Sequence, residues 1–283
     1  MPNRVPIALL VDDSCPFVHV YRYHWEDVHL KAPTTDDGRP LLDNIPNRFL
    51  DRFCDVVQRH SMAGKFSIIP APAGRGDVVR GIEGFDPAET RAWLDTAQTR
   101  LGPRFDFCSE GLTHNLTVDL KTGAFLPIGE LEWSHTQDRT TLTPYLLRQL
   151  ELLKTAGIDV TGNTSCWTFG QKVEAEYIAA MVAAQKAVYQ RDFSWYFLHI
   201  WHRFPESRPY IAYARGGTTL VSINSTVDDF FWATINSPRT DQAYIESITD
   251  LLLTADGQAG GIRDVLNAGG WPILMNHWQS FFS

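Results

Sequence analysis

Two adjacent carboxylates, Asp12 and Asp13, follow directly on an apolar run near the start of the chain. Because adjacent charges repel each other, a cation or a difference in burial must separate their pKa values. One carboxylate could then hold a metal ion while the other acts as a base. An N-cap or turn role in the following loop is the alternative explanation. We interpret the pair as the best candidate for the centre of a functional site.

A second candidate motif, Glu110-Gly-Leu-Thr-His114, places a carboxylate and an imidazole four residues apart. On a helical turn the two side chains would face the same direction and could ligate one ion. The motif alone has low specificity, because a surface ion pair at i and i+4 has the same spacing. Its position after a predicted strand favours the metal hypothesis.

A histidine near the end of the chain, His277, directly follows an apolar run. Its imidazole titrates near neutral pH, so it could serve as a general acid or base. The alternative is a histidine that is satisfied by its neighbouring strand.

Other polar and aromatic groups give weaker signals. The segment from Glu132 to Asp138, which includes His135, is dense in ligand-capable groups. His199 and His202 fit a site lining and a packed interior equally well. We interpret the second acidic pair, at 228–229, as a helix N-terminus. Nine tryptophans could include indoles that stack on sugar rings, although most tryptophans belong to the core.

These residues must be positioned by regular elements, and seven short apolar runs predict buried strands. They cover residues 7–11, 65–69, 104–108, 159–162, 195–200, 219–223 and 273–275. Helical periodicity lies between them at 47–59, 87–101, 143–156, 174–190 and 242–253. Asp86 and Pro87 predict the start of the second helix, and Pro144 and Gly157 bracket the third.

Alternation of strands and helices predicts a parallel sheet, and the strand count favours a distorted (β/α) barrel of about seven parallel strands with surrounding helices. We expect residues 1–283 to form this one domain, since barrels of roughly 250 residues are common. In such folds the site is built at the carboxyl ends of the strands. The candidate residues all follow or end predicted strands, which is the strongest argument for a shared site.

The composition narrows the classes of function. Hydrophobic residues make up 44% and charged residues 20% of the chain, which is typical of a globular protein. A net charge of -8 without a basic run argues against a nucleic-acid partner. The short apolar start predicts neither a signal peptide nor a membrane span, so we expect a cytoplasmic protein. Four scattered cysteines, without a CxxC pair, favour reduced thiols. The sequence contains no G-x-G-x-x-G, P-loop, H-E-x-x-H or G-x-S-x-G motif.

Taken in order, the motifs resemble those of the polysaccharide deacetylase family, within the glycoside hydrolase/deacetylase barrel superfamily. The family's strand ending in Asp-Asp is matched by 9–13, and its last strand ending in histidine by 273–277. Its His-x-x-x-His motif has the spacing of Glu110 to His114, with glutamate in place of the first histidine. Its aromatic loop corresponds to 164–167, which contains Trp167.

Three departures from the family pattern stand out. Ser14-Cys15-Pro16 follows the aspartates where the family has glycine. Glu110 makes the ligand set richer in oxygen, which shifts the preference from zinc towards manganese, magnesium or calcium, or abolishes binding. If His135 were aligned with the family's second motif instead, Arg139 would lie at a ligand position. We therefore prefer the alignment of Glu110 and His114 with that motif. Only six residues follow His277, whereas a helix usually follows the last strand in the family's barrel, so we expect either a truncated chain or the loss of that helix.

The resemblance implies a metal-dependent carbohydrate-active hydrolase that removes an acyl group from a sugar. It implies one divalent ion (Zn, Mn, Mg or Ca) on Asp13, Glu110 and His114, with Asp12 as base and His277 as general acid. The substrate-binding candidates are Trp167, His135, Trp278 and Asn115. Two alternatives stay open: a glycoside hydrolase or lyase that uses paired carboxylates, and a non-catalytic carbohydrate-binding barrel.

Overall fold

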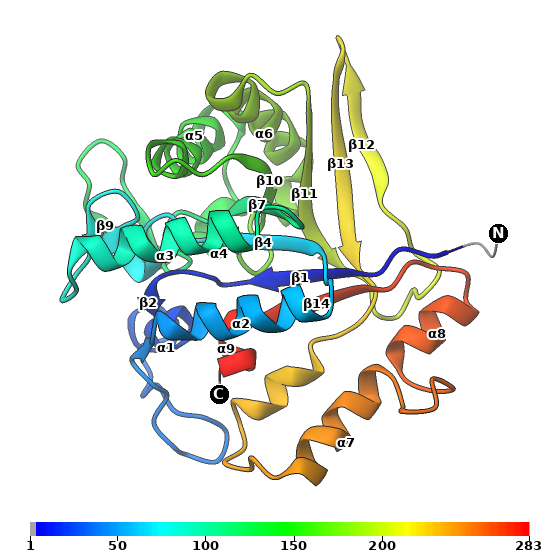
Figure 1. The fold of residues 1–283 in the computed structure, drawn as a ribbon. Helices are drawn as coiled ribbons and strands as arrows, with labels where there is room; N and C mark the ends of the chain where they lie inside the picture. Colours follow the sequence, from blue (N-terminus) through cyan, green and yellow to red (C-terminus); the bar gives the residue numbers. More distant parts are fainter. Residues whose placement is uncertain (1–3, 283) are drawn as a thin grey trace.

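The computed structural model describes residues 4–282, and its centre is one sheet of eight strands. Across the sheet the order is β12 (Tyr210–Arg215), β13 (Thr218–Ser225), β11 (Phe193–Ile200), β10 (Val160–Thr164), β7 (Phe105–Glu110), β4 (Gly64–Ile68), β1 (Ala8–Asp12) and β14 (Ile273–His277). Within this sheet seven strands run parallel, and β12 pairs antiparallel with β13. The sheet curls into a half-barrel with helices against its outer side (Figure 1).

The seven predicted strands are the seven parallel strands, so this part of the prediction is confirmed. Their ends differ from the prediction by one or two residues. The eighth strand, β12, was not expected. Short two-stranded pairs were also not expected; they are β2 (Phe17–Val18) with β3 (Asn44–Ile45), β5 (Gly76–Asp77) with β6 (Gly81–Ile82), and β8 (Leu116–Val118) with β9 (Phe125–Gly129).

Across the sheet, β13 and β14 are the first and the last of the parallel strands. Residues 226–227, just beyond β13, contact residues 273–275 of β14, and we call this short contact the seam. Val227 forms an isolated parallel bridge with Leu274. The backbone N–H groups of Thr226 and Val227 donate to the Ile273 carbonyl at 3.0 and 3.1 Å, and that of Met275 donates to Val227 at 3.2 Å. β12 occupies the edge of β13 that a full ladder would need. The strand pairing is therefore that of a curled open sheet, and a closed barrel is not confirmed.

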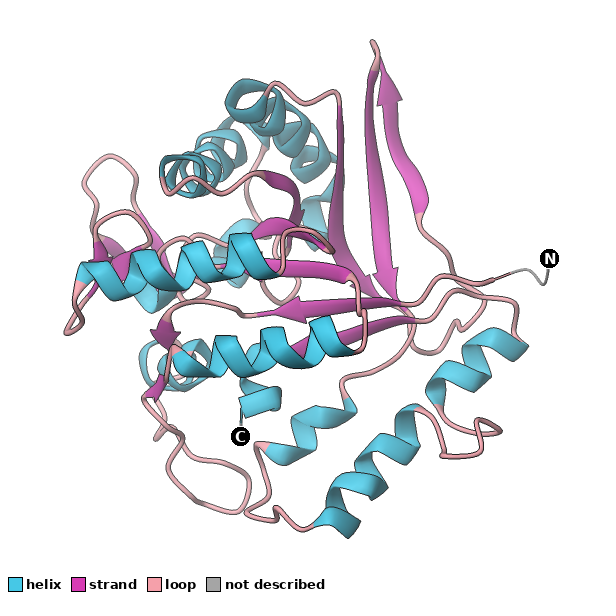
Figure 2. Cartoon of the chain, viewed as in Figure 1, coloured by secondary structure: helices cyan, strands magenta, loops and turns pink. Residues whose placement is uncertain are grey.

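The main helices connect consecutive parallel strands and cover the outer face of the sheet (Figure 2). They are α2 (Arg48–Arg59), α3 (Pro87–Arg100), α5 (Arg139–Thr155), α6 (Glu174–Tyr189), α7 (Gln242–Leu252) and α8 (Gly261–Asn267). Five of them match the predicted helices. The predicted start of α5 was wrong: Asp138 caps it by accepting from the N–H of Thr141 at 3.0 Å. Pro144 lies inside the helix, where the carbonyl of Thr140 loses its donor.

Shorter helices complete the chain between and after the strands. They are α1 (Val20–Asp27), α4 (Glu130–Ser134), α9 (Trp278–Phe282) and the 3₁₀ turns η1 (Pro72–Gly74), η2 (Gln171–Val173) and η3 (Phe230–Thr234). A short helix, α9, follows the last strand.

Strand alternation divides the apolar residues between two cores. On β1, Leu9 and Val11 pack with the outer helices in the main core. Leu10, on the other face, packs inside the curl of the sheet with Cys108, Trp195, Phe197, Ile273 and Met275. Asp12 follows Leu10 on this inner face, so the pattern that buries the strand also directs the carboxylate into the curl. All four cysteines are buried and free, as expected.

A buried histidine at the start of α1 makes the fold sensitive to acid. The Nδ1 of His19 accepts from the N–H of Arg22 at 3.3 Å, and the side chain is 1% exposed. Burial lowers the pKa of His19 to about 4. The unfolded chain binds a proton near pH 6.5 and the folded chain only near pH 4. Stability from this group is therefore present above pH 6.5 and is lost as the pH falls.

We expect the free energy of unfolding to fall by about 2.5 kcal/mol between pH 7.5 and 4.5 through His19 alone. His19→Asn keeps a capping side chain but has no proton to bind, so it should lack this component. Urea titrations at both pH values measure the difference, with the exposed His60→Asn as matched control. An equal pH dependence in wild type and His19→Asn would contradict the prediction.

Among residues 4–282, each helix is too short or too polar to cross a lipid bilayer.

Candidate metal centre

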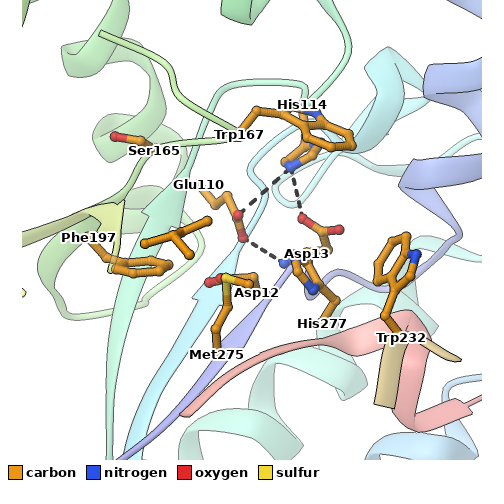
Figure 3. A pocket seen from close by; sticks show the side chains of 11 residues that line it. Asp12, Asp13, Glu110, His114, Ser165, Trp167, Phe197, Trp232, Met275 and His277 are labelled. Carbon is orange, nitrogen blue, oxygen red and sulfur yellow. Dashed lines mark hydrogen bonds and ion pairs between the residues drawn. The ribbon is translucent and has the colours of Figure 1, made fainter. Parts of the chain in front are cut away.

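The proposed metal ligands, together with Asp12, His277 and Trp167, meet in a pocket of about 230 Å³ at the carboxyl end of the parallel strands. β1, β7 and β14 end there, and loops after β7 and β10 close it (Figure 3). The pocket is lined by Asp12, Asp13, Glu110, His114, Ser165, Trp167, Phe197, Ile200, Trp232, Met275 and His277. The residues that the sequence placed at separate strand ends therefore share one cavity.

Asp13, Glu110 and His114 form a compact cluster whose potential ligand atoms lie within 4.8 Å of one another. The Nε2 of His114 is 2.8 Å from the Oδ1 of Asp13 and 3.8 Å from the Oε1 of Glu110. The other carboxylate oxygen of Glu110 accepts from the backbone N–H of Asp13 at 2.6 Å and from the hydroxyl of Ser67. All three side chains are buried. This cluster could hold a metal ion.

The charges of the cluster fit a bound cation. Burial would lower the pKa of His114, but the carboxylate of Asp13 outweighs burial and raises it to about 9. Burial favours neutral Asp13, yet the charge and hydrogen bond of His114 bring the pKa of Asp13 far below its usual value. Burial and the charge of Asp13 raise the pKa of Glu110. Without an ion, a proton on His114 thus offsets only one of the two buried carboxylate charges.

The donor set also fits a divalent ion chemically. Two oxygen donors and one nitrogen donor suit manganese, magnesium or calcium better than a site rich in nitrogen or sulfur would. Three protein ligands leave coordination positions open, which is typical of catalytic rather than structural metal sites. The Nδ1 of His114 has no hydrogen-bond partner among the described residues.

Three pocket residues have a left-handed backbone: Asp13 (φ 62°), His114 (φ 57°) and Trp167 (φ 54°). Each such conformation is unfavourable for a residue with a Cβ, and Trp167 is a large side chain for it. Backbone strain of this kind persists where the surrounding structure enforces it, and it is concentrated at functional sites. Three of the eight non-glycine residues with positive φ in residues 4–282 therefore lie at this cavity.

Asp12 lies beside the cluster and forms a buried ion pair with Lys65 of β4. The Nζ of Lys65 also donates to the Oγ1 of Thr164 at 2.7 Å and lies 5.1 Å from the ring centre of Phe197. Both charged side chains are almost fully buried. Burial lowers the pKa of Lys65. The ammonium group thus holds the Asp12 carboxylate in one position inside the curl of the sheet.

His277 is held by Asp229, at the start of η3. The Nδ1 of His277 is 2.8 Å from the Oδ2 of Asp229, which also accepts from the backbone N–H of His277 at 3.1 Å. Burial acts to lower the pKa of His277, but the hydrogen bond to Asp229 outweighs it and the pKa is raised. With Nδ1 engaged, Nε2 is the nitrogen left for a ligand. Trp232 packs against the imidazole ring at a centroid distance of 4.9 Å.

Some predicted site residues lie elsewhere. Trp278 is 1% exposed and packs in the core against Phe49, Phe53, Phe66 and Trp93, so it does not line the pocket. His135 lies at the end of α4, where its Nε2 is 3.0 Å from the Thr168 carbonyl. Asn115 is buried and donates to Asp27 at 2.6 Å. Of the four proposed substrate-binding residues, Trp167 is the one that lines the pocket.

Glu110 and His114 do not lie on one helical turn, the arrangement in which their spacing would point both side chains the same way. Glu110 ends β7, and His114 lies in the loop that follows. Gly111 has a φ of 60°, and an added Cβ would lie 2.6 Å from a carboxylate oxygen of Glu130. The loop folds back on itself, which brings the two side chains together without a helix.

Sequence reasoning missed Lys65, Asp229 and Trp232. A lysine within an otherwise apolar strand was a usable signal, because lysine is rarely buried without a partner. The interpretation of Asp229 as a helix cap is confirmed, since it accepts from the N–H of Trp232 at 3.1 Å. Its second role depends on His277, which lies 48 residues away and gives no local signal.

No protein-family model matches the chain, and no curated protein matches its sequence.

Proposed function

We propose that the chain is a metal-dependent hydrolase that removes acyl groups from carbohydrates, in the manner of the polysaccharide deacetylases it resembles. The observation that carries the proposal is the shared pocket: a cluster that could hold an ion lies beside one fixed carboxylate and one fixed imidazole. These three kinds of group are those that metal-assisted hydrolysis of an acyl bond uses.

Each residue receives a role from its surroundings. Asp13, Glu110 and His114 would hold a divalent ion, which when bound polarises an acyl carbonyl and acidifies water. Asp12, fixed by Lys65, accepts a proton from the attacking water. His277, fixed by Asp229, donates a proton through Nε2 to the leaving group. A carboxylate held in place and a histidine with a raised pKa suit the base and the acid respectively.

The carbohydrate part of the proposal is supported by the walls of the pocket. Trp167 is 43% exposed and Trp232 lies across the cavity beside His277 (Figure 3). Aromatic faces of this kind stack on the apolar faces of sugar rings. Phe197 and Met275 add apolar surface that suits the hydrocarbon part of an acyl group.

Metal analysis of the purified chain tests the proposal. We expect about one equivalent of a divalent metal in the wild type after dialysis against manganese, zinc or calcium, and none in Asp13→Asn or His114→Gln. The wild type should release acetate from acetylated sugars, and both variants should fall below detection. Asp192→Asn and His60→Gln, at exposed positions, serve as matched controls.

Other outcomes distinguish the remaining hypotheses. A chain that binds no metal under any of these conditions contradicts the proposed mechanism. Cleavage of glycosidic bonds without acetate release would favour a glycoside hydrolase that uses paired carboxylates. Sugar binding that survives Asp13→Asn, without turnover of either bond, would favour a non-catalytic binding protein.

A further inference from the structure

A buried carboxylate outside the pocket, that of Glu130, organises the loop between two of the proposed metal ligands. Glu130 begins α4 and is 1% exposed. Its Oε1 accepts from the backbone N–H groups of Leu112 at 3.0 Å and Thr113 at 2.9 Å, and its Oε2 accepts from that of His114 at 2.9 Å. Three successive amides of the loop therefore converge on one side chain.

Two side chains complete the shell around this carboxylate. The hydroxyl of Tyr145 donates to Oε1 at 2.6 Å, and the thiol of Cys166 lies 3.6 Å from Oε2. Every described partner is a donor, so the group acts as an acceptor on both oxygens. Hydrogen bonds from neutral donors to an ionised acceptor are about twice as strong as neutral pairs, and a buried carboxylate that lost them would be left unsatisfied.

The loop needs such an anchor because its own backbone is unfavourable. His114 has a φ of 57°, and Gly111 has a φ of 60° with Glu130 packed against its Cα. In this conformation the His114 imidazole turns back towards Glu110 and Asp13. Without three amides tied to one point, the loop could relax to negative φ and carry His114 away from the cluster.

We infer that Glu130 is a positioning residue for the metal centre: its carboxylate fixes the 111–114 loop so that His114 reaches the ion held by Asp13 and Glu110. The inference rests on the proposed metal site and adds a residue that contacts neither the ion nor the pocket. Groups that orient metal ligands typically contribute 10- to 100-fold to metal affinity, and an effect of about this size is expected here.

The test compares Glu130→Gln with wild type, with Glu132→Gln on the same helix as matched control. The amide keeps the size of the side chain but replaces one acceptor oxygen with a donor, which opposes a loop N–H. Equilibrium titration with Co²⁺ should show about 10- to 100-fold weaker binding in Glu130→Gln. The visible absorption of its bound Co²⁺ should differ from that of the wild type, because the imidazole no longer coordinates. Glu132→Gln should keep wild-type affinity and spectrum.

The outcomes separate this inference from the proposed site. If the wild type binds no Co²⁺, Mn²⁺ or Zn²⁺, the metal site itself is wrong and the inference falls with it. If the wild type binds Co²⁺ and Glu130→Gln binds it with equal affinity and spectrum, the positioning role alone is overturned. Should Glu130→Gln fail to fold, Gly111→Ala gives the same comparison, because its Cβ would displace the carboxylate oxygen 2.6 Å away.

Discussion

Lys65→Met should abolish hydrolysis and lower the free energy of unfolding by about 3–5 kcal/mol. Lys65 and Asp12 form an ion pair in which both side chains are almost fully buried. Removal of the ammonium leaves the Asp12 carboxylate without its counter-charge in a site of low dielectric constant. The carboxylate then either takes up a proton or moves, and in both cases it can no longer act as the base. Urea denaturation and an acetate-release assay measure the two effects.

Two further variants show whether the effects come from the loss of the buried charge pair. Lys186→Met removes a lysine from the exposed pair with Asp192 and should change stability by less than about 1 kcal/mol. In Lys65→Met/Asp12→Leu both charges are gone, so the double variant should recover most of the lost stability but none of the activity. Wild-type stability in the single variant would mean that Asp12 and Lys65 are not paired in the folded protein.

Asp229→Asn should lower the rate of acyl hydrolysis at neutral pH by about 10²- to 10⁴-fold, the usual contribution of a general acid. Asp229 raises the pKa of His277, and it fixes Nδ1 so that Nε2 faces the pocket. A general acid works in its protonated form, so the rate falls as the pH rises through the pKa of His277. Without the carboxylate this pKa is lower, and the descending limb of the pH–rate profile moves to lower pH.

The substitution is conservative for the local fold. Asp229 also caps η3 through Trp232, and asparagine can cap in the same way. Asp192→Asn, at an exposed position in another part of the chain, is the matched control and should keep the wild-type profile. Superimposable pH–rate profiles for Asp229→Asn and wild type would show that His277 is not the acid.

Much of the fold was predictable because its signals are local. Each parallel strand is a short apolar run bounded by turn residues, and such runs are typical of strands buried on both faces. The openness of the sheet was not predictable in this way. It depends on β12, whose run from Tyr210 to Ala214 was not interpreted as a strand, whose residues are exposed or half-buried, and whose pairing with β13 occupies the edge that closure needs.

In the site, too, the features with local sequence signals were predictable and those that depend on distant contacts were not. Asp13, Glu110 and His114 follow strands whose carboxyl ends meet, so their approach followed from a parallel sheet. The positions of the groups that hold these residues in place did not follow from the parallel sheet. Lys65 pairs with a residue 53 positions away, and the loop before His114 takes its shape from Glu130, 16 residues downstream of the histidine. Trp278 shows the opposite error: its place beside His277 in sequence suggested the pocket, but as the first residue of α9 it packs into the core.

The seam between β13 and β14 has a consequence for how the chain loses function under mild denaturing conditions. Few backbone hydrogen bonds join 226–227 to 273–275, whereas β1, β4 and β7 pair along continuous ladders. Regions with few such bonds open at lower free energy than the ladders do, without global unfolding. Asp229 and His277 lie on opposite sides of this seam, while the metal ligands belong to the continuous part. Partial opening would therefore separate Asp229 from His277 first and leave the cluster of Asp13, Glu110 and His114 intact.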